Sequence, residues 1–143
     1  MTIASVVSSR SKEMRRSAMS SQDSVELSIP AKVEFIRLGR LVGSGLAAQA
    51  EFSVDEIEDI RIAVDELCAT LVEHSVDGST MVLTFRIEGP TLRCTAHVEA
   101  ARAVTLDEIS THILVATVDE HDVQNDGDRV VGYLQKSRNT KSP

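Results

Sequence analysis

The most constraining feature of this chain is a long amphipathic segment that begins at Ser53. Ser53 can accept a hydrogen bond from the first turn of a helix, and Glu56 can bond back to Ser53, which is the pattern of a capping box. At about 100° per residue, the large apolar residues that follow form one stripe: Ile57, Ile60, Val64, Leu67, Cys68 and Leu71. The sequence therefore predicts a long helix with one buried face. Four polar residues are placed on the far side: Asp59, Glu66, Thr70 and Glu73.

Shorter patterns on both sides of this helix indicate strands and two further helices. Alternation of apolar and polar residues, together with turn residues such as Pro30 and Gly89, predicts strands over residues 25–29, 81–87, 92–98 and 129–135, and helices over 31–48 and 106–118. The order is strand, helix, helix, hairpin, helix, hairpin. This order predicts an α+β fold, a two-layer sandwich with a mixed, mainly antiparallel sheet and helices on one face.

The first predicted helix has two faces of different character. Its larger apolar residues gather on one side and are predicted to be core: Phe35, Leu38, Val42 and Leu46. The opposite side, with Val33, Arg37, Arg40 and Ser44, is either a solvated face or a docking face. Three glycines within this helix, at positions 39, 43 and 45, indicate close packing against another element or modest helix stability.

Size and charge narrow the class of protein. The chain has 143 residues, of which 42% are hydrophobic, so we expect one domain over 25–136, a disordered tail over 1–24 and a frayed end over 137–143. The net charge is −7, with three Phe, one Tyr and no Trp. Direct binding of nucleic acid is therefore disfavoured, because phosphates reward an excess of Lys and Arg, and bases stack on aromatic rings. A basic protein partner is expected instead.

Cysteine usage and hydropathy favour a cytoplasmic protein. Cys68 and Cys94 form neither a disulfide framework nor a C-x-x-C pair, so we expect two core thiols in a reducing compartment. No apolar run reaches the roughly 20 residues of a membrane-spanning helix, and we expect no membrane association. The N-terminus lacks the apolar stretch of a secretory signal. The histidines lack close ligand spacing, so we expect no metal site built on them.

A more specific signal lies in the run Ala63-Val64-Asp65-Glu66-Leu67-Cys68-Ala69-Thr70-Leu71-Val72-Glu73-His74. With Glu56-Ile57-Glu58-Asp59 before it, this run resembles the nucleotide-site helix of the anti-sigma serine kinases of the sporulation and general-stress switches. These kinases, the RsbW and SpoIIAB type, lie within the histidine-kinase-like ATPase superfamily. The resemblance extends over residues 25–136 and implies the fold of that superfamily. It also implies a sigma factor and an anti-anti-sigma factor as partners, a homodimer and, in an active kinase, ATP and Mg²⁺ as cofactors.

The resemblance assigns roles to two residues of this helix, whose family motif is Glu-x-x-x-Asn. Glu66 matches the general base for the attacking serine. Thr70 stands where the family has the Asn that holds magnesium between the ATP phosphates. Residues at i and i+4 share a helix face, so both side chains can reach one phosphate–metal cluster. A Thr hydroxyl reaches less far than an Asn amide, which predicts weakened magnesium binding. Glu66 is either a retained base or a solvated helix carboxylate.

Two further stretches depart from the family pattern for the nucleotide. Where the family has Asp-x-Gly, with the Asp accepting a hydrogen bond from adenine, this chain has Val98-Glu99-Ala100. Val98 cannot accept that bond, Ala100 lacks the backbone freedom of glycine, and Glu99 points to the other side of a strand. The glycine-rich lid is replaced by Asp107-Glu108-Ile109-Ser110-Thr111-His112, which adds two carboxylates. With Thr70, these departures predict a degenerate site in which ATP binding is weakened or lost.

Arg37 matches, by position, the first-helix arginine through which such anti-sigma proteins contact both the sigma factor and its antagonist. Arginine is also enriched at interface hot spots, so Arg37, with Arg40 and Val33 nearby, is the candidate partner-binding group. The alternative is an ordinary solvated face.

Three functions stay open at this point. We favour an anti-sigma factor that sequesters an alternative sigma factor and is relieved by an anti-anti-sigma antagonist. The second is an active serine-protein kinase that phosphorylates its antagonist, with Glu66 as base and Thr70 as magnesium ligand. The third is a degenerate scaffold that binds another regulator.

Overall fold

The computed structural model describes residues 23–139, so almost all of the predicted tail over 1–24 and the last four residues lie outside the described part. Its strands are β1 (Asp23–Pro30), β2 (Thr80–Glu88), β3 (Thr91–Glu99), β4 (Glu120–Asp126) and β5 (Arg129–Ser137). Its helices are the short 3-10 turn η2 (Val33–Phe35) and the α-helices α2 (Ile36–Gln49), α3 (Val54–Glu73) and α4 (Glu108–Thr117).

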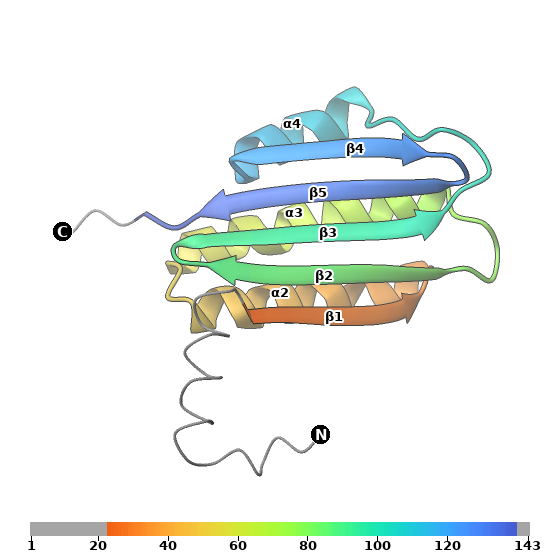
Figure 1. Ribbon diagram of the computed structural model, residues 1–143. Coiled ribbons are helices and arrows are strands. Elements are labelled where there is room, and N and C mark those ends of the chain that lie inside the picture. Colours follow the sequence, from red (N-terminus) through yellow and green to blue (C-terminus); the bar gives the residue numbers. More distant parts are fainter. Residues whose placement is uncertain (1–22, 140–143) are drawn as a thin grey trace, which may run out of the picture.

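The strands form one sheet in the order β1-β2-β3-β5-β4, and each neighbouring pair is antiparallel. The three α-helices lie behind one face of this sheet (Figure 1). Helix α3 is the middle one and packs against both α2 and α4. The predicted two-layer α+β sandwich is therefore confirmed. The described sheet is antiparallel throughout, whereas the sequence left room for a parallel pair.

The capping box at the start of α3 is present. The Glu56 amide donates to Ser53 Oγ at 3.1 Å, and the Ser53 amide donates to Glu56 Oε1 at 2.7 Å. The predicted apolar stripe of α3 faces the sheet, with Ile57 partly buried and the other five residues buried. Local capping and a 3.6-residue period thus place α3 across the centre of the sheet.

Helix α2 approaches the sheet through small residues. Its buried residues are Ile36, Gly39, Gly43 and Ala47. A Cβ added at Gly39 would lie 3.0 Å from Leu83, and one at Gly43 would lie 3.2 Å from Phe85. Of the two interpretations of the three glycines, close packing therefore holds for Gly39 and Gly43, whereas Gly45 has no atom within 4 Å of an added Cβ. The prediction of Leu38 as core is wrong, because the line of closest approach follows the glycines and leaves Leu38 36% exposed.

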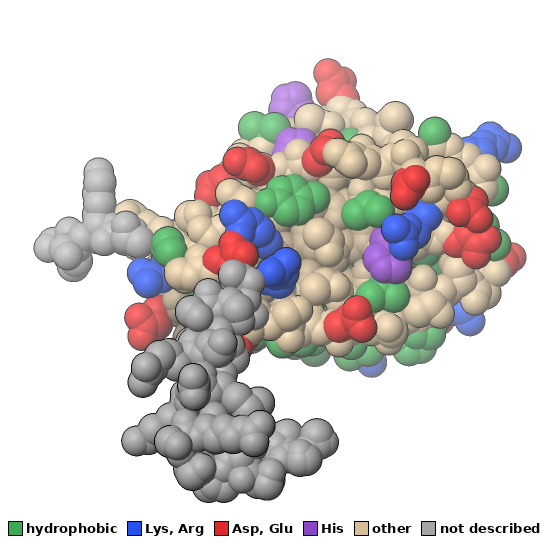
Figure 2. Space-filling view, viewed as in Figure 1, with side chains coloured by type: hydrophobic (Ala, Val, Ile, Leu, Met, Phe, Trp, Pro, Cys, Tyr) green, Lys and Arg blue, Asp and Glu red, His purple; other side chains and the backbone are tan. Residues whose placement is uncertain are grey.

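The two faces of the sheet differ. The inner face carries the core side chains of the central strands, among them Leu83, Phe85 and Cys94, each at most 2% exposed. No helix within residues 23–139 covers the outer face, and side chains of both charges surround a few hydrophobic ones there (Figure 2). Clean alternation along β2 and β3 produces this difference, since successive strand residues point to opposite faces.

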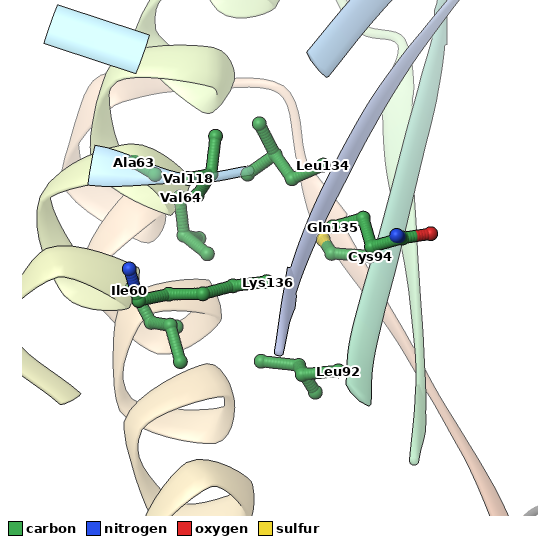
Figure 3. A pocket seen from close by; sticks show the side chains of 9 residues that line it. All are labelled: Ile60, Ala63, Val64, Leu92, Cys94, Val118, Leu134, Gln135 and Lys136. Atoms are coloured by element: carbon green, nitrogen blue, oxygen red, sulfur yellow. The ribbon is translucent and has the colours of Figure 1, made fainter. Parts of the chain in front are cut away.

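A small gap remains in the core between α3 and the strands β3 and β5. It has a volume of about 10 Å³ and is lined mainly by apolar side chains. Figure 3 shows the aliphatic stem of Lys136 running from β5 towards Ile60 of α3 beside this gap. The Lys136 ammonium donates to the Thr117 carbonyl at 2.8 Å and lies 3.6 Å from Asp59 Oδ2. One lysine therefore ties β5 to the end of α4 and to α3.

Candidate functional site

Glu66, the predicted catalytic base, lies on the flank of α3 that faces α4. It is half-buried, and its Oε2 accepts a hydrogen bond of 2.5 Å from Ser110 Oγ of α4. Ser110 itself is only 6% exposed. Neither sequence interpretation of Glu66 described this arrangement, because one carboxylate oxygen is already bonded to a hydroxyl group of the chain itself. It is bonded to a serine 44 positions further along the chain.

Thr70, the predicted substitute for the magnesium ligand, is buried at 7% exposure. Its hydroxyl donates to the Glu66 carbonyl of the same helix at 3.1 Å. The prediction that Thr70 lies on the exposed side of the helix is wrong. The apolar period located only the side of α3 against the sheet, whereas α4 covers a second side of the same helix. A buried hydroxyl that is already bonded within its own turn is poorly placed to ligate an ion.

The adenine positions follow the sequence expectation for strand β3. Val98 is 1% exposed and lies on the inner face, whereas Glu99 is exposed on the outer face. Ala100 is buried, and its amide donates to the Asp128 carbonyl at 2.8 Å. The position that would have to accept a hydrogen bond from adenine therefore holds the apolar Val98. The neighbouring carboxylate, Glu99, points to the other face of the sheet.

The chain between β3 and α4 is fixed to the sheet by Asn125. The side chain of Asn125 accepts from the Val104 amide at 2.8 Å and donates to the Val104 carbonyl at 3.0 Å. Asp107 then caps α4, because its Oδ1 accepts from the Ser110 amide at 2.7 Å. This backbone hydrogen bond lowers the pKa of the Asp107 carboxyl from its ordinary value. The segment that matches a phosphate-binding lid thus ends in a capped helix with carboxylates at its start.

The three predicted partner-binding residues differ in their exposure and in their contacts. Arg37 is exposed on α2, and Val33 of η2 is 72% exposed. Arg40 is half-buried, and its guanidinium forms an ion pair of 2.6 Å with Asp65 of α3. Leu41 of α2, which the sequence did not single out, is 64% exposed. We call Val33, Arg37 and Leu41 the α2 surface; Arg40 instead fixes α2 against α3.

Metal ligands, thiols and membrane-spanning helices are the other features on which a site could depend. Within 23–139 there is no group of three or more His, Cys, Asp and Glu residues that could hold a metal ion. Both cysteines are free and buried, and burial raises the pKa of the Cys68 thiol to about 12. Among the same residues, no helix is long and apolar enough to cross a membrane.

Ser110 and Asn125 are the residues of this region that sequence reasoning missed. Their partners lie 44 and 21 positions away, so no local pattern marks them. One signal was available: the segment with Ser110 has no glycine and opens with Asp107, which is typical of a helix start rather than of a flexible lid. A helix at this place must pack on its neighbour, and α3 is that neighbour.

The sheet with three helices on one face agrees with the histidine-kinase-like ATPase fold. A crystal structure of the RsbU and RsbW domains of a Mycobacterium tuberculosis protein is similar, with a TM-score of 0.67 over 81% of this chain and 32% of that chain. At 16% sequence identity this similarity concerns the fold. No protein-family model matches the chain.

Sequence relatives point in the same direction. The chain is 44% identical over 66 residues to the serine-protein kinase RsbW of Halalkalibacterium halodurans, and 46% identical over 56 residues to RsbW of Listeria monocytogenes. These matches cover 46% and 39% of this chain, and 41% and 36% of the relatives. The chain thus matches less than half the length of these relatives. Over the matched stretches, the predicted resemblance to serine-protein kinases of the RsbW type is confirmed.

Proposed function

We propose that this protein is an anti-sigma factor that sequesters an alternative sigma factor by direct contact and releases it to an anti-anti-sigma antagonist. Kinship with RsbW supports a role of the anti-sigma or serine-kinase type. The observation that favours binding over phosphorylation is the 2.5 Å contact between Ser110 Oγ and Glu66 Oε2. This hydrogen bond occupies an oxygen of Glu66, the candidate base, while Arg37 stays exposed.

The α2 surface is the proposed partner site. It combines an exposed guanidinium, Arg37, with two exposed apolar side chains, Val33 and Leu41. Such a combination suits an interface, because arginine and apolar anchors surrounded by polar groups contribute most of the binding energy. The Arg40–Asp65 ion pair stabilises the α2 surface indirectly, because it holds α2 on α3. Arg40 is therefore proposed as a positioning residue and not as a contact.

ATP binding is proposed to be weakened or lost. Two contacts to the nucleotide lack a suitable group, because Thr70 is buried and Val98 is apolar. The candidate base, Glu66, is in addition bonded to Ser110. Losses at separate contacts to one ligand each reduce its affinity. The carboxylates of Asp107 and Glu108 at the start of α4 add repulsion for phosphate.

The active kinase remains the second candidate because Glu66 is retained. In that case α4 would have to move away before Glu66 could take a proton from a substrate serine. A degenerate scaffold that binds another regulator is the third candidate. A homodimer and a cytoplasmic location remain predictions, and size-exclusion chromatography with light scattering tests the homodimer.

The test of the main proposal is capture of purified sigma factors by the wild-type chain and by Arg37→Glu. We expect one alternative sigma factor to be captured and Arg37→Glu to reduce this capture strongly. The matched control is Arg102→Glu, which makes the same charge change at an exposed residue ahead of α4, across the helix layer from α2. Equal capture by both variants and the wild type would remove Arg37 from the interface. No capture of any sigma factor would favour the scaffold.

A further inference from the structure

Helix α4 is held against the rest of the molecule at three places. At its N-terminal side, Asn125 of β4 bonds both backbone groups of Val104. In its first turn, Ser110 bonds Glu66 of α3. At its C-terminal end, the Lys136 ammonium bonds the Thr117 carbonyl. The three donors or acceptors come from β4, α3 and β5, so each contact joins α4 or its approach to a different element.

The Ser110–Glu66 contact is the one that touches the candidate chemistry. A serine hydroxyl at 2.5 Å from a carboxylate oxygen has the geometry that a general base requires of its substrate. Here the hydroxyl belongs to the chain itself, on Ser110, a residue that is 6% exposed. Hydrogen bonds to ionised groups are among the stronger ones in proteins, and partial burial strengthens them further.

We propose that α4 is a lid latched shut over Glu66 by the chain itself, with Ser110 acting as an internal substitute for a substrate serine. The latch prevents Glu66 from acting as a general base, and it keeps α4 ordered without a ligand. This inference rests on the proposed function in that it concerns the same site. It adds that α4 is closed by Ser110 and Glu66, and it makes a claim that does not depend on any sigma factor.

Hydrogen–deuterium exchange of the full chain, read by mass spectrometry, tests the latch directly, since amide exchange reports local opening. In the wild type, peptides covering 108–117 should be protected without nucleotide. Ser110→Ala removes the bond and should raise exchange in α4 about tenfold, while β2 and β3 keep their protection. The matched control is Thr111→Ala, because the Thr111 hydroxyl bonds only the Asp107 carbonyl of its own turn, at 2.8 Å.

A double-mutant cycle separates the latch from general weakening of the helix. Glu66→Ala should raise α4 exchange as much as Ser110→Ala does, and the double variant should add little, because both changes remove the same bond. Glu66→Gln retains an oxygen that can accept, and should give an intermediate effect. This conservative variant keeps the test valid if Glu66→Ala unfolds the chain.

Two results would overturn the latch. One is exchange in Ser110→Ala no faster than in Thr111→Ala. The other is a wild-type α4 that exchanges freely and becomes protected only when ATP with Mg²⁺ is added, because a ligand would then close the lid. Failure of the proposed function has a different signature: no sigma factor is captured, although α4 is protected and released as described.

Discussion

The packing of the sheet against α3 can be tested at Gly132 of β5. A Cβ built at this position would lie 2.6 Å from Leu67 Cδ1 and 3.0 Å from Leu67 Cγ. Carbon atoms in contact prefer about 3.5–4.0 Å, so Leu67 would have to move by about 1 Å. Leu67 is 1% exposed and has little room to move. Gly132→Ala should therefore destabilise the fold.

The expected magnitude follows from two opposing terms. Overpacking of a filled core costs about 1–3 kcal/mol. Because an added Cβ makes three close contacts with Leu67, we expect a cost in the upper part of this range, about 2–3 kcal/mol. Loss of backbone freedom in the unfolded chain offsets about 0.5–1 kcal/mol of that cost. The free energy of unfolding should thus fall by about 1–2.5 kcal/mol. Urea denaturation followed by far-ultraviolet circular dichroism measures it, with unchanged m-values as a condition.

Two controls make this prediction refutable. Gly45 of α2 has no atom within 4 Å of an added Cβ, so Gly45→Ala should stabilise the protein by up to about 1 kcal/mol. In a Leu67→Ala background the obstructing atoms are gone, and Gly132→Ala should be neutral or slightly stabilising there. The reasoning fails if Gly132→Ala costs the same in both backgrounds, or if it stabilises the parent chain.

The remaining predictions concern the α3 cap and the core thiols. Ser53→Ala removes the acceptor of the Glu56 amide and should lower the free energy of unfolding by about 1 kcal/mol, measured by urea denaturation; a loss below 0.3 kcal/mol would count against the cap. The Ser53 amide lowers the pKa of Glu56 in the folded state, so this carboxylate stabilises the fold above its unfolded pKa. The contribution should be lost as the pH falls through the folded pKa, and Glu56→Gln should flatten the decline in melting temperature below about pH 4. Burial raises the pKa of the Cys68 thiol to about 12, so Cys68 should react with a thiol reagent at about pH 8 only at the rate of unfolding. Rapid labelling of Cys68 in the folded protein would show that the core is open.

The long helix and the central hairpin were predictable because their signals are local. A capping box and a 3.6-residue period determine α3, and period-2 alternation determines β2 and β3. Helix α2 was harder, since the prediction ranked side chains by size. The chain instead brings Gly39 and Gly43 closest to the sheet, and Leu38 turns outward. The glycines were noticed in the sequence, but their direction depends on the neighbouring strand.

The candidate site was predictable only in its residue types. The sequence identified Glu66 and Thr70 as a pair on one helix face, but a single helical period cannot show that two neighbours cover α3 from two sides. The burial of Thr70 and the bond from Ser110 both depend on how α4 packs on α3. The distinction between Arg37 and Arg40 has the same origin, because Asp65, which engages Arg40, lies 25 positions away on α3.

The central claim is that this protein regulates by binding and not by phosphorylation, and calorimetric titration of ATP with Mg²⁺ into the purified full chain tests it most directly. Because Thr70 is buried, Val98 is apolar, and the carboxylates of Asp107 and Glu108 stand at the start of α4, we expect no saturable heat up to millimolar ATP. Saturable binding of ATP at micromolar affinity would contradict the account and would favour the active kinase.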